Sequence, residues 1–178
     1  MIGQTLRYLG IRGEADCETV RLAAECLEEL KKTVNPKFIK RTFLPFEADN
    51  GLFLKGENIK RLLDGAQKVV LFAATLGIEA DRAIKRYQKK DMAKAAVFDA
   101  AAAAYLENFL DSIDFSEDKL MPTMRFSPGY GDYPIEMQKV ILKLLKAEKI
   151  GISLLDSFML TPSKTVTAVL GLIPLSRF

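Results

Sequence analysis

Apolar side chains recur every three or four positions in several stretches of the chain, which is the spacing of one buried helix face. Two such stretches directly follow Asp16 and Asp91, and aspartate is a preferred helix N-cap. Pro134 stands where proline often begins a helix. The pattern predicts helices over residues 17–34, 57–63, 78–90, 92–112 and 134–146.

Other stretches alternate apolar with polar residues or form compact apolar runs, as strands do. Residues 68–74 are the most compact, with Val69 to Phe72 at their centre. Strands are also expected over residues 6–11, 121–126, 153–160 and 165–172, and short strands around a turn over residues 38–54. Because strands and helices mix without a regular strand–helix–strand period, the pattern favours the α+β class.

The composition limits the size and the partners of the protein. A chain of 178 residues with 49% hydrophobic content can bury one core, so we expect a single domain over residues 1–178. The net charge is only +3 without a long Lys/Arg run, which disfavours binding to nucleic acid. Neither a signal peptide at residues 1–10 nor an apolar stretch of the ~20 residues that span a bilayer is recognisable, so we expect a cytoplasmic protein without membrane contact.

Histidine is absent from the sequence, and this excludes several kinds of site. A histidine-dependent nucleophile, a histidine-ligated zinc or an imidazole ligand to a cofactor metal cannot be built, and we expect no metal site. Cys17 and Cys26 lie on one predicted helix, roughly 13 Å apart at ~1.5 Å per residue, so we expect two reduced thiols. Chemistry must then come from a bound cofactor or a partner protein.

Residues 125–134, Arg-Phe-Ser-Pro-Gly-Tyr-Gly-Asp-Tyr-Pro, have the features of a cradle for a small anionic or zwitterionic ligand. Arg125 can hold a carboxylate with two parallel hydrogen bonds. Gly129 and Gly131 permit backbone angles that expose N–H groups, and Tyr130 between them offers a hydroxyl and an aromatic face. The helix expected next points its positive end toward this loop. The same residues are also ordinary turn formers, so a solvated surface turn is the alternative.

This segment resembles the Arg-x-x-x-Gly-Tyr signature of the activation domain of cobalamin-dependent methionine synthase, which binds S-adenosylmethionine. Further segments are similar to that family in the same chain order: the apolar strand and turn at 71–77, the alanine-rich helix through Tyr105-Leu106, and Ser157 to Thr167. Together they span about residues 70–172. The resemblance implies the fold of that domain, an antiparallel twisted sheet with flanking helices.

In that family the domain docks over the corrinoid after its cobalt has been oxidised to inactive Co(II). An electron from a flavodoxin-like donor and a methyl group from S-adenosylmethionine then regenerate methylcobalamin. The resemblance implies a stand-alone activation subunit of a split methionine synthase, because 178 residues leave no room for the homocysteine, folate or cobalamin modules. Such a subunit meets a cobalamin-binding partner polypeptide and is not expected to be catalytic by itself.

The resemblance also assigns roles to the candidate loop. Arg125 is expected to hold the carboxylate of S-adenosylmethionine, and Tyr130 with the adjoining backbone completes the pocket. Gly129 and Gly131 are expected to make room for the ligand. The sequence departs from the family directly after the tyrosine, where Gly131-Asp132-Tyr133-Pro134 replaces the family's Pro-Ala-Cys-Pro.

Other candidate residues lie outside the signature. Glu107 and Asn108 lie on the helix that faces the pocket in the family, so either is a candidate for the amino group or the sulfonium of the ligand; a solvated helix face is the equal alternative. Tyr133 and Lys164 are candidates for facing the corrinoid or the partner, and simple exposure is the alternative for Lys164.

Two other functions remain open. The substitutions after Tyr130, and Val169 and Leu170 where longer family members carry aromatics, suit a cap or chaperone of a corrinoid protein that does not use S-adenosylmethionine. The third possibility is reactivation of a different corrinoid methyltransferase.

Overall fold

The computed structural model describes residues 1–50 and 54–177 and combines helices with a four-stranded sheet, which confirms the α+β class. The chain folds into two compact units. Unit 1 comprises Met1–Lys37, Thr75–Ile113 and Pro162–Thr165, and unit 2 comprises Phe38–Ala74, Asp114–Thr161 and Val166–Phe178. The single domain over residues 1–178 stays a prediction.

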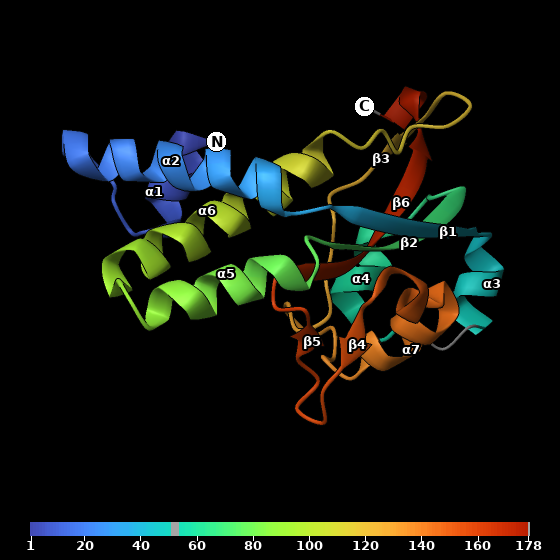
Figure 1. Ribbon diagram of the computed structural model, residues 1–178. Helices are drawn as coiled ribbons and strands as arrows, with labels where there is room; N and C mark the ends of the chain where they lie inside the picture. Colours follow the sequence, from blue (N-terminus) through green and yellow to red (C-terminus); the bar gives the residue numbers. More distant parts are fainter. Residues whose placement is uncertain (51–53, 178) are drawn as a thin grey trace. The chain divides into compact units, whose positions relative to one another are not determined.

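Unit 1 is helical. Its helices are α1 (Ile2–Tyr8), α2 (Cys17–Thr33), α5 (Ile78–Gln88) and α6 (Met92–Asp111) (Figure 1). Helix α6 packs against α1, α2 and α5, and its small side chains let these neighbours approach closely. The buried alanines of α6 are Ala95, Ala100, Ala101, Ala102 and Ala104. No helix in the part of the chain that the structure describes has the length and apolar character needed to cross a bilayer.

Two aspartates begin the long helices of unit 1, as predicted. Asp16 Oδ1 accepts a 2.8 Å hydrogen bond from the backbone N–H of Thr19. Asp91 Oδ1 accepts one of 2.9 Å from the backbone N–H of Lys94. Each carboxylate satisfies an N–H group that has no partner inside its helix, and this fixes where the helix begins.

Unit 2 contains the sheet (Figure 1). Its strands lie in the order β1 (Lys37–Phe43), β2 (Lys68–Thr75), β6 (Thr165–Pro174) and β3 (Leu120–Pro122). Strand β3 runs antiparallel to β6, with Met121 opposite Ile173. A separate short hairpin pairs β4 (Ser153–Leu154) with β5 (Leu160–Thr161). Strand β2 is buried from Val69 to Thr75, which explains why it reads as a compact apolar run rather than an alternating one.

The core of unit 2 joins the strands to α7 (Met137–Leu145). Leu71 and Val169 from the central strands lie in one apolar cluster with Ile141 and Leu145 from α7. Ile59, from α4 (Glu57–Leu62), is fully buried in the same cluster. The remaining short elements are α3 (Pro45–Asn50), η1 (Ala147–Ile150) and η2 (Leu175–Arg177).

The strand predicted over residues 6–11 is wrong, because this part of the chain begins inside helix α1. The hydroxyl of buried Thr5 donates a 3.2 Å hydrogen bond to the carbonyl oxygen of Met1, and the chain leaves the helix at Gly10 with φ +80. Over so few residues a strand pattern and a helix pattern are hard to tell apart. Packing of α1 on α2 and α6 decides for the helix.

The short strands predicted over residues 38–54 are confirmed only in the first part. Strand β1 ends at Phe43, and the chain then forms helix α3 instead of a second strand. Pro45 stands at the first helical position, and Glu47 Oε2 accepts a 2.8 Å hydrogen bond from the backbone N–H of Leu44. This is a capping arrangement that favours a helix. Residues 51–53 lie outside the described residues.

Three further boundaries differ from the prediction. The strand expected over residues 153–160 is the β4–β5 hairpin, and Phe158 in its turn has a φ of +61. The strand expected over residues 121–126 is β3 followed by an isolated bridge at Phe126. The helix expected from Pro134 begins at Met137, and residues 135–136 before it form a turn.

Candidate functional site

The candidate loop of unit 2 begins beside the central strand β6. Phe126 exchanges two backbone hydrogen bonds of 2.9 Å with Val169, so the chain next to Arg125 is held in an extended, paired conformation. Arg125 itself is half-buried. A guanidinium on a paired segment loses less freedom when it grips a carboxylate than one on a mobile tail. The structure therefore places Arg125 on a rigid support.

Backbone hydrogen bonds close the loop on itself. The N–H of Gly129 donates to the carbonyl of Tyr133 at 2.8 Å, and the N–H of Tyr133 donates to the carbonyl of Tyr130 at 3.0 Å. This turn sends the two tyrosines to different environments, since Tyr130 is 67% exposed and Tyr133 is 1% exposed. The ring of Tyr133 stacks on Phe126 with 6.0 Å between centroids. Sequence reasoning expected Tyr133 to face a partner, whereas the structure buries it in the core of unit 2.

Asp132 fastens the loop to helix α4. Its Oδ2 accepts a 2.6 Å hydrogen bond from the backbone N–H of Glu57, and its Oδ1 accepts one of 3.1 Å from that of Asn58. Desolvation raises the pKa of this carboxyl, but these two donors outweigh it and hold the pKa below its ordinary value. Sequence reasoning treated Asp132 as an ordinary turn residue. One feature indicates that α4 needs a capping group from elsewhere in the chain: its N-cap residue is Gly56, which has no side chain to cap it.

The two candidate glycines are packed against their own chain. A Cβ on Gly129, which has a φ of +92, would lie 3.0 Å from Cδ1 of Ile135. A Cβ on Gly131, which has a φ of +55, would collide with Nδ2 of Asn58. The positive φ favours glycine at both positions, and the close neighbours are the ends of the Ile135 and Asn58 side chains. The role of these glycines in making room for a ligand stays a prediction.

The remaining candidates, Glu107, Asn108 and Lys164, belong to unit 1. Glu107 is half-buried and Asn108 is exposed on α6. Asn108 lines a hollow of about 310 Å³ together with Lys31 and Tyr105. Lys164 is only 14% exposed, and its Nζ lies 2.9 Å from Oδ1 of Asp99. Lys164 is therefore a member of an ion pair inside unit 1 rather than a side chain extended into solvent.

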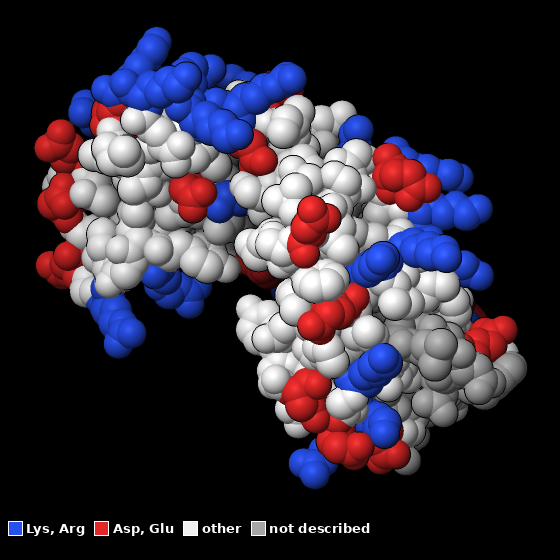
Figure 2. Space-filling view, turned by 90° about the horizontal axis from the view of Figure 1, so that it is seen from below, with Lys and Arg blue, Asp and Glu red and all other residues white. Residues whose placement is uncertain are grey.

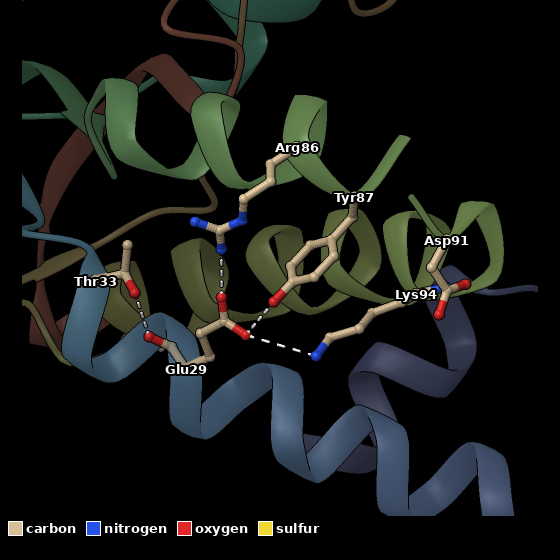
Figure 3. Close-up of polar contacts among 6 residues, drawn as sticks. All are labelled: Glu29, Thr33, Arg86, Tyr87, Asp91 and Lys94. Atoms are coloured by element: carbon tan, nitrogen blue, oxygen red, sulfur yellow. Dashed lines mark hydrogen bonds and ion pairs between the residues drawn. The ribbon is translucent and has the colours of Figure 1, made fainter. Parts of the chain in front are cut away.

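Unit 1 also contains a polar cluster that sequence reasoning missed (Figure 3). Glu29 on α2 accepts a 2.8 Å hydrogen bond from Arg86 and one of 2.6 Å from the phenol of Tyr87, both on α5. Lys94 on α6 lies 3.8 Å from the same carboxylate. Desolvation acts to lower the pKa of Lys94, but the Tyr87 phenol and Glu29 outweigh it and raise that pKa. The cluster ties three helices together, and nothing in the spacing of these residues announces it.

Charged side chains of both signs lie on the face drawn in Figure 2, with Lys and Arg gathered along one edge. Helix α5 and the turn after it carry five exposed basic residues, Arg82, Lys85, Arg86, Lys89 and Lys90. Arg82 pairs with Glu79, and Arg86 pairs with Glu29. Part of this positive charge is therefore neutralised inside unit 1.

No family model matches the sequence, and no curated protein matches it. Among solved structures, the chain is similar to a crystal structure of the MetH reactivation domain bound to AdoHcy, with a TM-score of 0.59 and 19% sequence identity over 99% of this chain and 77% of that chain. The chain has the fold of that reactivation domain. The antiparallel sheet with flanking helices that the sequence resemblance implied is therefore confirmed.

Unit 2 contains two buried side-chain oxygens that lack a hydrogen-bond partner among the described residues. Gln138 Oε1, in the first turn of α7, and Thr167 Oγ1, on β6, have no hydrogen-bond partner within residues 1–50 and 54–177. Thr167 lies two positions from Val169 and hence on the same face of β6, the face on which Val169 enters the core of unit 2. Buried polar atoms without partners are rare, because each costs about 1–3 kcal/mol. Both atoms lie on elements that flank the candidate loop.

Within the described ranges, no three Asp, Glu or Cys side chains come together in a way that could hold a metal ion. Cys26 is fully buried and Cys17 is exposed, and both are free thiols.

Proposed function

We propose that the protein is an activation component that binds S-adenosylmethionine and supports the reductive remethylation of an oxidised corrinoid carried by a partner protein. The observation that carries this proposal is the Arg-x-x-x-Gly-Tyr turn, held by backbone pairing to β6, in a chain that shares the reactivation-domain fold over 99% of its length. The neighbour with that fold is bound to AdoHcy, the demethylated form of S-adenosylmethionine.

The residues of unit 2 fit a ligand of this kind. Arg125 would take the carboxylate of the ligand in a two-point grip, and the 67% exposed ring of Tyr130 would cover an adenine or ribose face. The roles predicted for Glu107 and Asn108 of unit 1 stay predictions.

The chemistry asked of the chain is positioning. A reductant would supply the one electron that converts the partner's Co(II) to Co(I), and bound S-adenosylmethionine would then supply the methyl group and leave as AdoHcy. The chain needs no general acid or base for this transfer, which agrees with a sequence without histidine. Its side chains hold the methyl donor and orient the sulfonium. The binding energy then offsets the entropy that is lost when donor and acceptor are brought together.

We propose further that the chain acts in the cytoplasm as a separate subunit of a split methionine synthase. It would meet a cobalamin-binding polypeptide and a flavodoxin-like electron donor in trans. The positive side chains on α5 suit an acidic partner surface. This arrangement predicts activity only in a mixture of components.

Calorimetric titration with S-adenosylmethionine and AdoHcy tests the ligand part. We expect saturable binding that Arg125→Ala weakens at least about tenfold, as expected for loss of a charge-assisted bidentate contact. Arg82→Ala is the matched control, because Arg82 is an exposed arginine of unit 1 paired with Glu79. Absence of binding to the unaltered chain, or equal loss in both variants, would contradict the proposal.

The reactivation part has its own assay. An oxidised methionine synthase truncated before its activation domain is mixed with this chain, S-adenosylmethionine and a reductant. We expect turnover to return only when all components are present. Turnover that returns equally without the chain would contradict the proposed role.

One observation favours a second candidate, a corrinoid-protein cap that does not use S-adenosylmethionine. The space beside Gly131 is filled by Asn58, and the loop is fastened by Asp132, a residue that departs from the family pattern. This candidate predicts co-purification with a corrinoid protein without uptake of AdoHcy. Capture of a different corrinoid methyltransferase in the same experiment would identify the partner as another enzyme.

A further inference from the structure

The candidate loop and helix α4 are joined by a contact that spans more than seventy positions of sequence. The carboxylate of Asp132 accepts hydrogen bonds from two successive backbone N–H groups, of Glu57 at 2.6 Å and of Asn58 at 3.1 Å. Two successive N–H groups meeting one carboxylate form a charge-assisted contact of defined direction. The contact therefore fixes the orientation of the loop as well as its position.

A glycine directly precedes each partner in this contact, Gly56 before Glu57 and Gly131 before Asp132. A Cβ on Gly56, which has a φ of +108, would lie 2.7 Å from the carbonyl oxygen of Asp132. A Cβ on Gly131 would collide with the amide of Asn58. At Gly56 the two backbones can approach this closely only because the residue has no side chain, and at Gly131 the missing side chain leaves room for that of Asn58. Loop and helix fit each other on both sides of the carboxylate.

On the loop side, Asp132 lies two positions after Tyr130, the candidate for contacting the ligand. Tyr130 is tied to Tyr133 through the backbone hydrogen bond of 3.0 Å, and Asp132 lies between them. Tyr133 is anchored by its buried ring, so Asp132 restrains the exposed half of the same turn. Without that restraint, the glycines on either side of Tyr130 would allow the turn many conformations.

We propose that Asp132 is a positioning residue for ligand binding, which holds the Gly129–Tyr133 turn on α4 so that Tyr130 presents its ring to the ligand. This inference rests on the proposed function, because it states which residue holds that same site in its binding conformation. A ligand binds only the conformations that fit it, so its dissociation constant rises as the fraction of competent conformations falls. If release of the turn lowers this fraction to about one tenth, the dissociation constant rises about tenfold.

The test compares variants of the full chain by AdoHcy calorimetry. We expect Asp132→Ala to raise the dissociation constant about tenfold, and Asp132→Asn, which keeps one acceptor oxygen but loses the charge, to restore part of the affinity. Asp156→Ala is the matched control, because Asp156 is an exposed aspartate in the β4–β5 turn of unit 2. Its affinity should equal that of the unaltered chain.

Amide hydrogen exchange supplies the second measurement. Release of the turn should speed exchange in peptides covering residues 54–59 and 127–134 of Asp132→Ala, and leave the peptide covering α6 unchanged. If Asp132→Ala does not fold, Asp132→Asn carries the comparison, with smaller changes in the same direction.

The outcomes separate the two proposals. If the unaltered chain, Asp132→Ala and Asp132→Asn all bind AdoHcy equally well, the role of Asp132 is overturned. The proposed function is then unaffected. Weaker binding without faster exchange in the two peptides also overturns the role of Asp132, because the effect then does not act through the turn. Unaltered chain that binds no AdoHcy overturns the proposed function, and the positioning role with it.

Discussion

The backbone N–H of Tyr133 donates a 3.0 Å hydrogen bond to the carbonyl of Tyr130, and the turn so formed places one phenol in solvent and the other in the core. Tyr130 is 67% exposed and Tyr133 is 1% exposed. Burial raises the pKa of the Tyr133 phenol above its ordinary value. Three positions of sequence therefore separate a side chain suited to contacting a ligand from one that holds the fold together.

The two tyrosines should respond differently to truncation. Tyr133→Ala removes a ring stacked on Phe126 and should lower the free energy of unfolding by about 3–5 kcal/mol. Tyr130→Ala should change it by less than about 0.5 kcal/mol and instead weaken AdoHcy binding. Urea unfolding of both variants gives the comparison, and a similar loss of stability in both would refute the separation of roles.

Glu29 should be important for the stability of unit 1. Its carboxylate, in a side chain 28% exposed, receives donors from Arg86 and Tyr87, and Glu29→Gln removes the charge that strengthens them. We expect a loss of about 2 kcal/mol in the free energy of unfolding, measured with urea. The control is Glu28→Gln, whose partner Lys31 lies on the same helix at the surface; this change should have no measurable effect. Equal effects of the two changes would argue against a special role for the cluster.

The ion pair between Lys164 and Asp99 can be measured with a double-mutant cycle. Lys164→Met, Asp99→Asn and the double variant should give a coupling energy of about 0.5–1 kcal/mol, because Lys164 is mostly buried while Asp99 is 52% exposed. AdoHcy affinity should be unchanged by Asp99→Asn. A coupling energy of zero would mean that Lys164 is available for contacts outside unit 1.

The two cysteines should differ in reactivity. Burial raises the pKa of the Cys26 thiol from its ordinary 9.0 to about 11, whereas Cys17 is exposed. Ellman's reagent at pH 8 should modify Cys17 in the native protein and both thiols after unfolding. Rapid modification of both in the native state would contradict the burial of Cys26.

The same shift has a consequence for stability in alkali. The folded state holds the Cys26 proton more tightly than the unfolded state, so this contribution is complete below pH 9 and is lost as the pH rises from about 9 to about 11. The urea midpoint of the unaltered chain should therefore fall more steeply over that interval than that of Cys26→Ala. Parallel curves for the two proteins would show that the thiol does not ionise on unfolding.

The sequence was sufficient wherever the structure depends on neighbours in the chain. Asp16 and Asp91 cap the helices that follow them, and the apolar run of β2 is a buried strand, because capping and hydrophobic periodicity act over a few residues. The sequence also located the Arg125 to Pro134 segment and, through its resemblance, the fold.

The tertiary structure decided what depends on distant partners. Helix α1 forms in place of the predicted strand because it packs on α6, and Tyr133 turns inward because Phe126 is paired to β6. Asp132 does more than form a turn, because two backbone N–H groups of α4 lie within hydrogen-bond distance of its carboxylate. The loop is thereby held against α4. Hydrogen bonds and close packing require partners at a few ångströms, and a partner seventy positions away leaves no local pattern in the sequence.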